Sequence, residues 1–432
     1  MHLSAFASAF RTPDLRKKLL FTLGIIALFR LGAVVPTPGI DYEAVQSCVA
    51  TVEGNSLYGL INLFSGGALL QLSVFALGIM PYITASIILQ LMTVVIPKLE
   101  ALKKEGQSGQ AQITQYTRYL TVALAILQST GIVALARTPG QLFQGCNAQL
   151  IADDQVFTIF MMIATMTAGT AVVMWLGELI TDRGVGNGMS LLIFTSIISS
   201  FPSQIASVFA TRGPFITGLT LLVGFFIIMA VVFVEQGQRR IPVQYAKRMV
   251  GRKMYGGTST YIPLKVNMAG VIPVIFASSL LFLPVLFLQF SDQTGSVAQF
   301  VARNFQQGNE PLYLFTFAVL IIFFTYFYVA ITFNTTEVAD NMKKYGGFIP
   351  GIRAGRPTAE YLDYVVSRLT MPGSVYLALV AILPLFAFNG IGVSGNFVFG
   401  GTSLLIMVGV GLDTVKQIES QLQQRNYEGF LR

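Results

Sequence analysis

The sequence predicts an all-α polytopic membrane protein, with ten transmembrane helices in two inverted five-helix halves and a short re-entrant helix. Three observations carry this prediction. Of 432 residues, 53% are hydrophobic and 11% are charged, whereas about 25% are charged in a soluble domain. Apolar runs near the length that crosses a bilayer, about 20 residues, recur along the chain. Positive charges gather in alternate loops, as in a multi-pass protein of fixed orientation.

Apolar runs bounded by glycine, proline or charge define the predicted spans. They are 19–35, 74–96, 118–137, 155–178, 189–210, 214–234, 269–290, 312–333, 371–388 and 397–415. The first run follows a basic segment, Arg11 to Lys18, and we interpret it as a retained span because no small-residue cleavage site follows it. With that segment in the cytosol, the predicted outer loops hold only Arg137, Arg212 and Arg303. Both termini are therefore expected to be cytosolic.

A long uncharged stretch lies between Glu53 and Lys98. Its preceding flank carries only acids and its following flank is basic, so the two flanks lie on opposite sides and the stretch crosses an odd number of times. We predict one full span, Val74 to Ile96, preceded by a segment from Leu57 to Gln71 that enters the membrane level without crossing. Such backbone is tolerated only inside protein or along a cavity. The glycine-rich piece Ser65–Gly67 is thus expected in a channel-like interior.

The ten spans divide into five and five at the short turn 211–214. The halves are residues 1–212, with spans 1–5, and 213–432, with spans 6–10. Because five is odd, the halves would have opposite orientation, which is typical of inverted repeats with a functional path between them. No convincing residue identity links the halves, so ten spans without internal symmetry is the alternative.

Two large cytosolic loops are predicted at about 235–267 and 334–370. The first has seven cations against a single acid, Glu235, and alternation around Ile241, Val243 and Tyr245 predicts a projecting β-ribbon that turns near Gly251. The second predicts short helices at 336–345 and 358–369 with a glycine-rich tip between them. Both loops have the charge of docking surfaces for an acidic partner, either ribosomal RNA or acidic protein.

The spans contain little that could perform chemistry. Ion-coupled transporters place ionisable groups near the midplane, and the span centres at 155–178, 269–290, 312–333 and 397–415 are uncharged. A small-solute secondary transporter, which an inverted repeat would also suit, is the alternative function. The absence of a midplane carboxylate or histidine speaks against it. Arg30 is close enough to the outer end of its span to snorkel, so a structural role is favoured over a functional one. With one histidine, His2, and no nucleophile motif, we expect no enzyme, metal or cofactor.

Two further features leave alternatives open. Ile79 and Ile83 are four residues apart and share a helix face, which suits either ordinary packing or a hydrophobic constriction that excludes water and ions. The two cysteines, Cys48 and Cys146, both fall in predicted outer loops, where they either form a disulfide or remain unpaired thiols.

Several sequence blocks resemble the bacterial SecY translocon family along nearly the whole chain. They are Pro36-Thr-Pro-Gly-Ile-Asp41, Phe64-Ser-Gly-Gly-Ala68, Phe75-Ala-Leu-Gly-Ile-Met-Pro-Tyr-Ile83, Lys104-Glu-Gly106, Trp175-Leu-Gly-Glu178, Arg183-Gly-Val-Gly-Asn-Gly188, Gly237-Gln-Arg-Arg240, Tyr245-Ala-Lys-Arg248, Leu264-Lys-Val-Asn-Met-Ala-Gly-Val-Ile-Pro273, Gly351-Ile-Arg353 and Phe399-Gly-Gly-Thr-Ser403. The resemblance implies a protein-conducting channel that translocates unfolded secretory proteins and releases apolar segments laterally into the bilayer. It also implies the bacterial plasma (inner) membrane.

By the same resemblance, a ring of aliphatic residues closes the pore, a plug helix lies outside it, and a lateral gate opens between the second and seventh spans. The ring positions are Ile79, Ile83, Met189, Ile193, Ile275 and Ile406. The plug, about 57–71, includes Leu60, Asn62, Phe64, Ser65, Gly66 and Gly67. Met189 departs from the isoleucine common in the family, but a flexible thioether still fills the gap.

The resemblance also implies partners for the basic loops. The residues expected to dock cytosolic partners are Arg239, Arg240, Lys247, Arg248, Arg252, Lys253 and Arg353. The expected partners are the SecE and SecG subunits, the SecA motor ATPase, the ribosome, signal peptides, nascent chains and anionic lipids. Ala354 and Thr335 stand where the family usually has proline, which could loosen the second loop without touching the pore.

Overall fold

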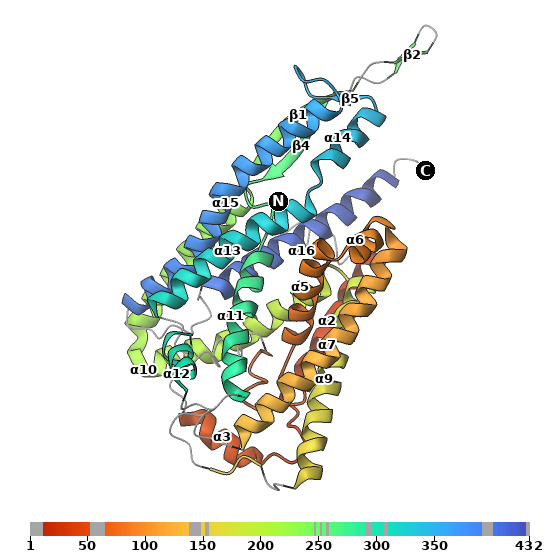
Figure 1. Cartoon of the computed structure of the whole chain (residues 1–432). Coiled ribbons are helices and arrows are strands. Elements are labelled where there is room, and N and C mark those ends of the chain that lie inside the picture. The colour runs from red at the N-terminus through yellow and green to blue at the C-terminus, as the bar shows by residue number, and fades with distance from the viewer. Residues whose placement is uncertain are drawn as a thin grey trace.

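The computed structural model describes residues 12–51, 65–137, 148–151, 155–245, 248–250, 253–255, 259–290, 295–305, 310–390 and 401–428. Helices dominate the described part of the chain (Figure 1). They are α2 (Pro13–Val34), α3 (Tyr42–Thr51), α5 (Met80–Val95), α6 (Pro97–Lys104), α7 (Gln107–Ala136), α9 (Val156–Arg183), α10 (Gly188–Glu235), α11 (Ile272–Phe290), α12 (Ser296–Phe305), α13 (Pro311–Thr332), α14 (Thr335–Lys344), α15 (Arg356–Gly390) and α16 (Gly401–Glu428).

Each of the ten predicted spans coincides with a helix over most of its described length. Five described helices are long and apolar enough to cross a membrane, and a sixth span results if α5 and α6 are taken together. One of the five, α10, contains two predicted spans, 189–210 and 214–234. The chain is therefore a multi-pass membrane protein, while the full count of ten stays a prediction.

The predicted turn between the fifth and sixth spans is a break inside α10. Gly213 has φ 81° and ψ 174°, which no helix contains, and Pro214 follows it. Glycine reaches this region of backbone space without a steric cost. The helix therefore changes direction at the predicted boundary of the two halves.

The span predicted at 74–96 begins later than expected, because helix α5 starts only at Met80. Residues 66–79 form a series of turns instead, and Ser73 makes an isolated β-bridge to Pro36. Positive φ angles at Leu72 (47°) and Gly78 (55°) interrupt any helix there, and Pro81 then favours a helix start. Of the predicted non-crossing segment, residues 57–64 lie outside the described residues, and 66–71 are turns rather than helix.

The first of the two large predicted loops, at about 235–267, is the projecting β-ribbon that the sequence predicts. Strands β1 (Gln238–Tyr245) and β4 (Ser259–Lys265) pair antiparallel, and β2 (Arg248–Val250) pairs with β3 (Lys253–Tyr255) farther out. Ile241 and Val243 are buried on one face of β1 while Arg240 and Pro242 are exposed. This alternation is the pattern from which the ribbon was predicted.

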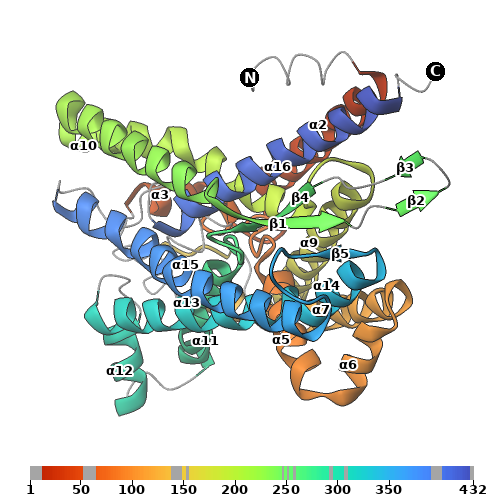
Figure 2. The same ribbon diagram turned by 90° about the horizontal axis from the view of Figure 1, so that it is seen from above.

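The second large predicted loop, at about 334–370, joins the same sheet. Strand β5 (Gly347–Phe348) pairs with the end of β1 through Gln244 and Tyr245, which the sequence did not predict. The predicted short helix at 336–345 is α14. The helix predicted at 358–369, however, continues without a break through Pro372 into the ninth predicted span as α15. Viewed from above, α11, α13 and α15 gather on one side and α5, α6 and α7 on the other (Figure 2).

Three main apolar clusters hold these elements together. The largest connects α2, α5, α9, α10, α11, α13, α15 and α16 at the centre of the molecule. A second packs α3 and the turns at 69–77 against α7 and α9, and a third fills the base of the cytosolic sheet. Cys48 of α3 is fully buried in the second cluster and is disulfide-bonded; Cys146 lies outside the described residues.

Candidate functional site: an aliphatic ring at the centre of the helices

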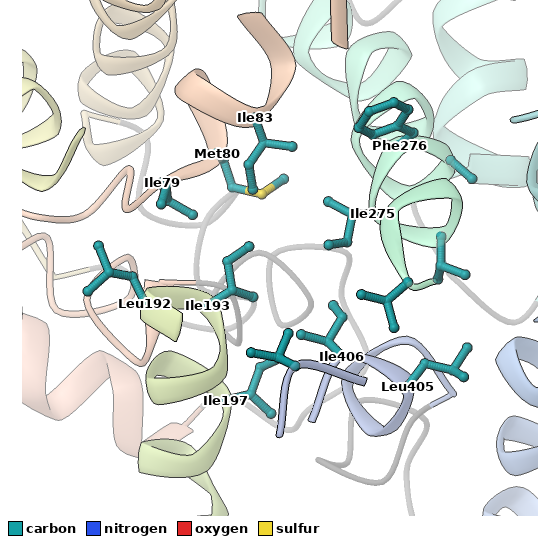
Figure 3. Close-up of a cluster of buried hydrophobic side chains, with 14 of the residues drawn as sticks. Ile79, Met80, Ile83, Leu192, Ile193, Ile197, Ile275, Phe276, Leu405 and Ile406 are labelled. Atoms are coloured by element: carbon teal, nitrogen blue, oxygen red, sulfur yellow. The ribbon is translucent and has the colours of Figure 1, made fainter. Parts of the chain in front are cut away.

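Six isoleucines meet at the centre of the molecule, and we call them the aliphatic ring. They are Ile79, Ile83, Ile193, Ile197, Ile275 and Ile406, and none is more than 7% exposed. They come from the start of α5, from α10, from α11 and from α16, and their side chains point toward one another across a common centre (Figure 3). Elements from both ends of the chain therefore build one apolar constriction.

Helix starts position the ring. Ile83 and Ile275 are each the fourth residue of their helix, and Ile193 and Ile406 are each the sixth. The N-terminal ends of four helices thus lie at the constriction, and a helix N-terminus carries a partial positive charge. The side chains that fill the centre have no polar atoms. The constriction therefore has an apolar lining without hydrogen-bonding groups, and the partial positive charges of the helix N-termini lie around it.

Two positions differ in burial from the other predicted ring residues. Met189, at the start of α10, is partly buried and packs against the same central cluster, with its sulfur against Gly177 of α9, so its place in the ring stays a prediction. Ile197, which was not predicted, is fully buried and faces the ring. It is four residues beyond Ile193 on one helix face. The same spacing argument that selected Ile79 and Ile83 could have found it.

A glycine-rich piece of chain lies beside the ring. Gly66 sits between α2 and α10: its carbonyl accepts a hydrogen bond from Arg30 Nη1 at 2.9 Å, and an added Cβ would lie 3.1 Å from Cα of Ser196. Ser196 stands between Ile193 and Ile197 in the sequence, so Arg30 holds this segment next to the ring. Of the residues predicted for the plug, Ser65, Gly66 and Gly67 are described, and Leu60, Asn62 and Phe64 lie outside the described residues.

Two helices of the centre contact each other as the resemblance implies. Helix α11 packs against α5 and also against α7. Ile275 belongs to α11 and Ile83 to α5, so the ring and this helix pair share residues. A movement between α5 and α11 would therefore change the ring.

The described basic residues of the two large loops lie on the ribbon and in the turn after β5. Arg239 and Arg240 are exposed on β1, and Arg240 stacks over the Tyr261 ring at 4.8 Å. Arg248 and Lys253 lie in β2 and β3, whereas Lys247 and Arg252 lie outside the described residues. Arg353 is exposed in the turn after β5, and its carbonyl accepts a hydrogen bond from Thr358 Oγ1 at 2.8 Å. Because β5 pairs with β1, both basic loops belong to one surface.

Buried or partly buried polar contacts also join the helices. Arg118 of α7 makes a two-point ion pair with Glu178 of α9, at 2.8 and 2.9 Å. Glu235 and Asn267, both buried, are joined by a 2.7 Å hydrogen bond. The sequence prediction used neither Asn267 nor Glu235 as a functional residue. The available signal was that Glu235 is the single acid of a strongly basic loop.

The fold and the constriction define a class of protein: a multi-pass helical membrane channel with a dry, aliphatic closure. The SecY family model matches residues 73–415. Proteins named protein translocase subunit SecY are 66% identical in Streptomyces scabiei, over 100% of both chains, and 60% identical in Mycobacterium tuberculosis, again over 100% of both chains. The chain therefore belongs to the SecY family.

Solved structures share the fold. One described as "The structure of a protein conducting channel" has a TM-score of 0.61 at 18% identity, covering 93% of this chain and 91% of that one. Another, "Sec61 in the Canine ribosome-channel complex from the endoplasmic reticulum", has a TM-score of 0.58 with the same coverage. Family and fold together identify a protein-translocation channel rather than an enzyme, and they do not favour the small-solute transporter.

Proposed function

We propose that this chain conducts unfolded secretory proteins outward across the bacterial plasma membrane and releases apolar segments sideways into the bilayer. The observation that carries the proposal is the aliphatic ring, which closes the centre of the molecule with side chains from four separate elements. In this proposal both termini are cytosolic, and the partner supplies the energy.

The lining of the ring suits a polypeptide of any sequence. Isoleucine side chains make no hydrogen bonds, so they impose no directional requirement on what passes. When the side chains meet, an apolar constriction excludes water and ions. A ring built from four elements also widens by small movements of each. The same residues therefore seal the channel when it is shut and close around the polypeptide that passes through it when it is open.

The segment Ser65–Gly67 supports a second layer of closure. It lies beside the ring, and Arg30 anchors it through the Gly66 carbonyl. We assign it to the base of a plug that extends over about 57–71. The α5 and α11 pair, which contact each other and share the ring, is the proposed lateral gate. An apolar segment would leave between them because lipid solvates it as well as the channel does.

The two halves of the proposal are residues 1–212 and 213–432. The break at Gly213 supports this boundary. SecE is proposed to hold the halves together, with SecG beside them, and anionic lipids are proposed to surround the basic cytosolic face. The SecA motor and the ribosome are proposed to dock on Arg239, Arg240, Lys247, Arg248, Arg252, Lys253 and Arg353. Signal peptides and nascent chains are the proposed cargo.

Replacing Ile406 tests the ring. Ile406 is fully buried, so Ile406→Asn places an amide in the constriction and lets water enter. Ion conductance of vesicles containing the shut channel should rise about tenfold. Ile406→Leu, which keeps an apolar lining, is the control and should conduct like the wild type. Equal conductance of all three proteins would remove the ring from the mechanism.

Reversing the charge of Arg353 tests the docking surface. Because its side chain is exposed, Arg353→Glu should leave the channel assembled while repelling an acidic partner, and SecA-driven export of a preprotein into vesicles should fall by about tenfold or more. The control is Arg356→Glu, three residues away, where the native arginine pairs with Glu360. Near-normal export with Arg353→Glu contradicts the docking assignment.

A further inference from the structure

The cytosolic ribbon is connected directly to two membrane helices. Strand β1 begins three residues after Glu235, the last residue of α10, and β4 ends seven residues before α11 begins at Ile272. The ladder continues past both strands, because the Val266 N–H donates to the Gly237 carbonyl at 3.0 Å. The base of the ribbon therefore lies at the junction of α10 and α11.

One side-chain amide closes this junction. Asn267 Nδ2 donates to Glu235 Oε1 at 2.7 Å and to the Gly270 carbonyl at 3.0 Å. Asn267 is 2% exposed and Glu235 is 8% exposed, so water competes little for either bond. Such bonds are strong in a medium of low dielectric constant. They connect the end of α10, the base of the ribbon and the turn that leads into α11.

The amide acts only as a donor. Asn267 Oδ1 is buried and has no hydrogen-bond partner within the described residues. Burying an acceptor without a partner costs free energy. Packing alone therefore does not explain why an asparagine occupies this position. The two hydrogen bonds that its N–H groups donate are what stabilises the junction.

The turn held by Asn267 leads at once to the ring. Val271 follows Gly270, and the Val271 carbonyl accepts from the Ile275 N–H at 3.3 Å in the first turn of α11. Ile275 is a member of the aliphatic ring. Ile275 thus lies only five residues after Gly270, and the first turn of α11 can transmit a displacement of the turn to the constriction.

Helices α15 and α16 also contact the base of the ribbon near this junction. An added Cβ on Gly373 of α15 would lie 2.6 Å from the Val266 carbonyl, so α15 packs directly against the ribbon base. The Tyr376 hydroxyl donates to the Val231 carbonyl of α10 at 3.4 Å. Lys265 also pairs with Asp413 of α16, but this contact is exposed. The buried Glu235–Asn267 contact is therefore the one placed to carry force.

We propose that Glu235 and Asn267 are positioning residues that couple partner docking on the ribbon to the movement of α11 and the ring. The inference rests on the proposed function. A partner that shifts the ribbon moves Asn267, and the two amide bonds carry that shift into the first turn of α11. Without them, the six residues between β4 and α11 would absorb it.

The test compares two near-isosteric changes in the full chain, assembled with its translocon subunits in vesicles. Asn267→Asp replaces the donor by a carboxylate facing Glu235, whereas Glu235→Gln keeps an oxygen that accepts from Asn267. Asp413→Asn removes the exposed ion pair at the same base and is the matched control. For each protein, SecA affinity, SecA-driven preprotein export, thermal stability and SecA-dependent cross-linking between cysteines placed on α5 and α11 are measured.

We expect Asn267→Asp to bind SecA within about twofold of the wild type while export and SecA-dependent cross-linking fall about tenfold. Glu235→Gln and Asp413→Asn should export like the wild type. Combining Glu235→Gln with Asn267→Asp restores a donor and should recover part of the export. Export of Asn267→Asp at the wild-type level, or loss of SecA binding together with export, overturns the inference. Failure of the wild type to export overturns the proposed function instead.

Discussion

The contacts that join α2, α7 and α9, before Gly213, differ in kind from those that join α11 and α13, after it. Before it, polar contacts join neighbouring elements: Arg118 with Glu178, Ser129 with Thr167 at 3.2 Å, and the Val185 N–H with Thr22. After it, aromatic rings join α11 and α13. Phe276 meets Phe324 edge to face at 5.7 Å and Tyr328 at 6.3 Å.

This difference bears on which part can move. A hydrogen bond or ion pair in a membrane interior is directional, and sliding the helices breaks it. Edge-to-face aromatic contacts, worth about 0.5–1.5 kcal/mol each, tolerate a range of offsets. The helices α2, α7 and α9 thus form the more rigid frame, whereas α11 can shift against α13. Three changes test this contrast by their effect on thermal stability.

The largest effect is expected at the contact between α9 and α10. Gly188 packs directly on the Gly177 carbonyl, where a Cβ would overlap the backbone. Gly188→Ala should therefore cost about 3 kcal/mol, because both helices must move apart. Gly218→Ala, in the same helix with nothing within 4 Å of the added Cβ, is the control and should not lower the melting temperature. A tolerated Gly188→Ala would show that this frame is not rigid.

An intermediate effect is expected in the aromatic part. Phe324 is 2% exposed, and Phe324→Ala leaves a gap between α13 and α11. The loss should be about 2 kcal/mol, below values for soluble cores because lipid is the alternative environment. Its neighbour Phe323 is 55% exposed, so Phe323→Ala should cost less than half as much. Hydrogen exchange should increase in α11 and α13 only; an increase in α7 and α9 would contradict the contrast.

The smallest effect is expected at the ion pair between α7 and α9. Glu178→Gln should cost about 1 kcal/mol, since Arg118 is 43% exposed and water partly replaces its partner. Glu100→Gln, which breaks the exposed pair with Lys104, should leave the melting temperature unchanged. The Glu178 loss should shrink at high salt. If the loss of stability did not depend on the salt concentration, the contact would contribute through packing rather than through charge.

Much of the architecture was predictable because it depends on length and charge. The basic flanks and apolar runs place helices at all ten predicted spans, and the alternation at Ile241 and Val243 predicts the ribbon. The late start of α5 was not predicted, because an apolar run from Val74 onward cannot show that Leu72 and Gly78 adopt positive φ. The unbroken α15 was missed because proline is a helix-ending signal in water, whereas Pro372 is tolerated inside this helix.

The site was predictable only where spacing or resemblance pointed to it. Five predicted ring residues come together in the structure, but burial alone distinguishes Ile197 from Met189 as the sixth member. The bond between Glu235 and Asn267 joins residues 32 apart in the sequence. It depends on the path of a whole ribbon between them. Pairings of this kind, like that of β5 with β1, follow from tertiary packing and have no local pattern.

The break at Gly213 means that the covalent link between the two parts of the chain contributes little to holding them together. Thr211, Arg212 and Pro214 around it are exposed, and the two parts meet instead through contacts such as those of α5 and α7 with α11. A polypeptide divided at this point would keep every one of those contacts. The covalent connection at this point ensures that the two halves are present in equal numbers. It does not determine how they pack against each other.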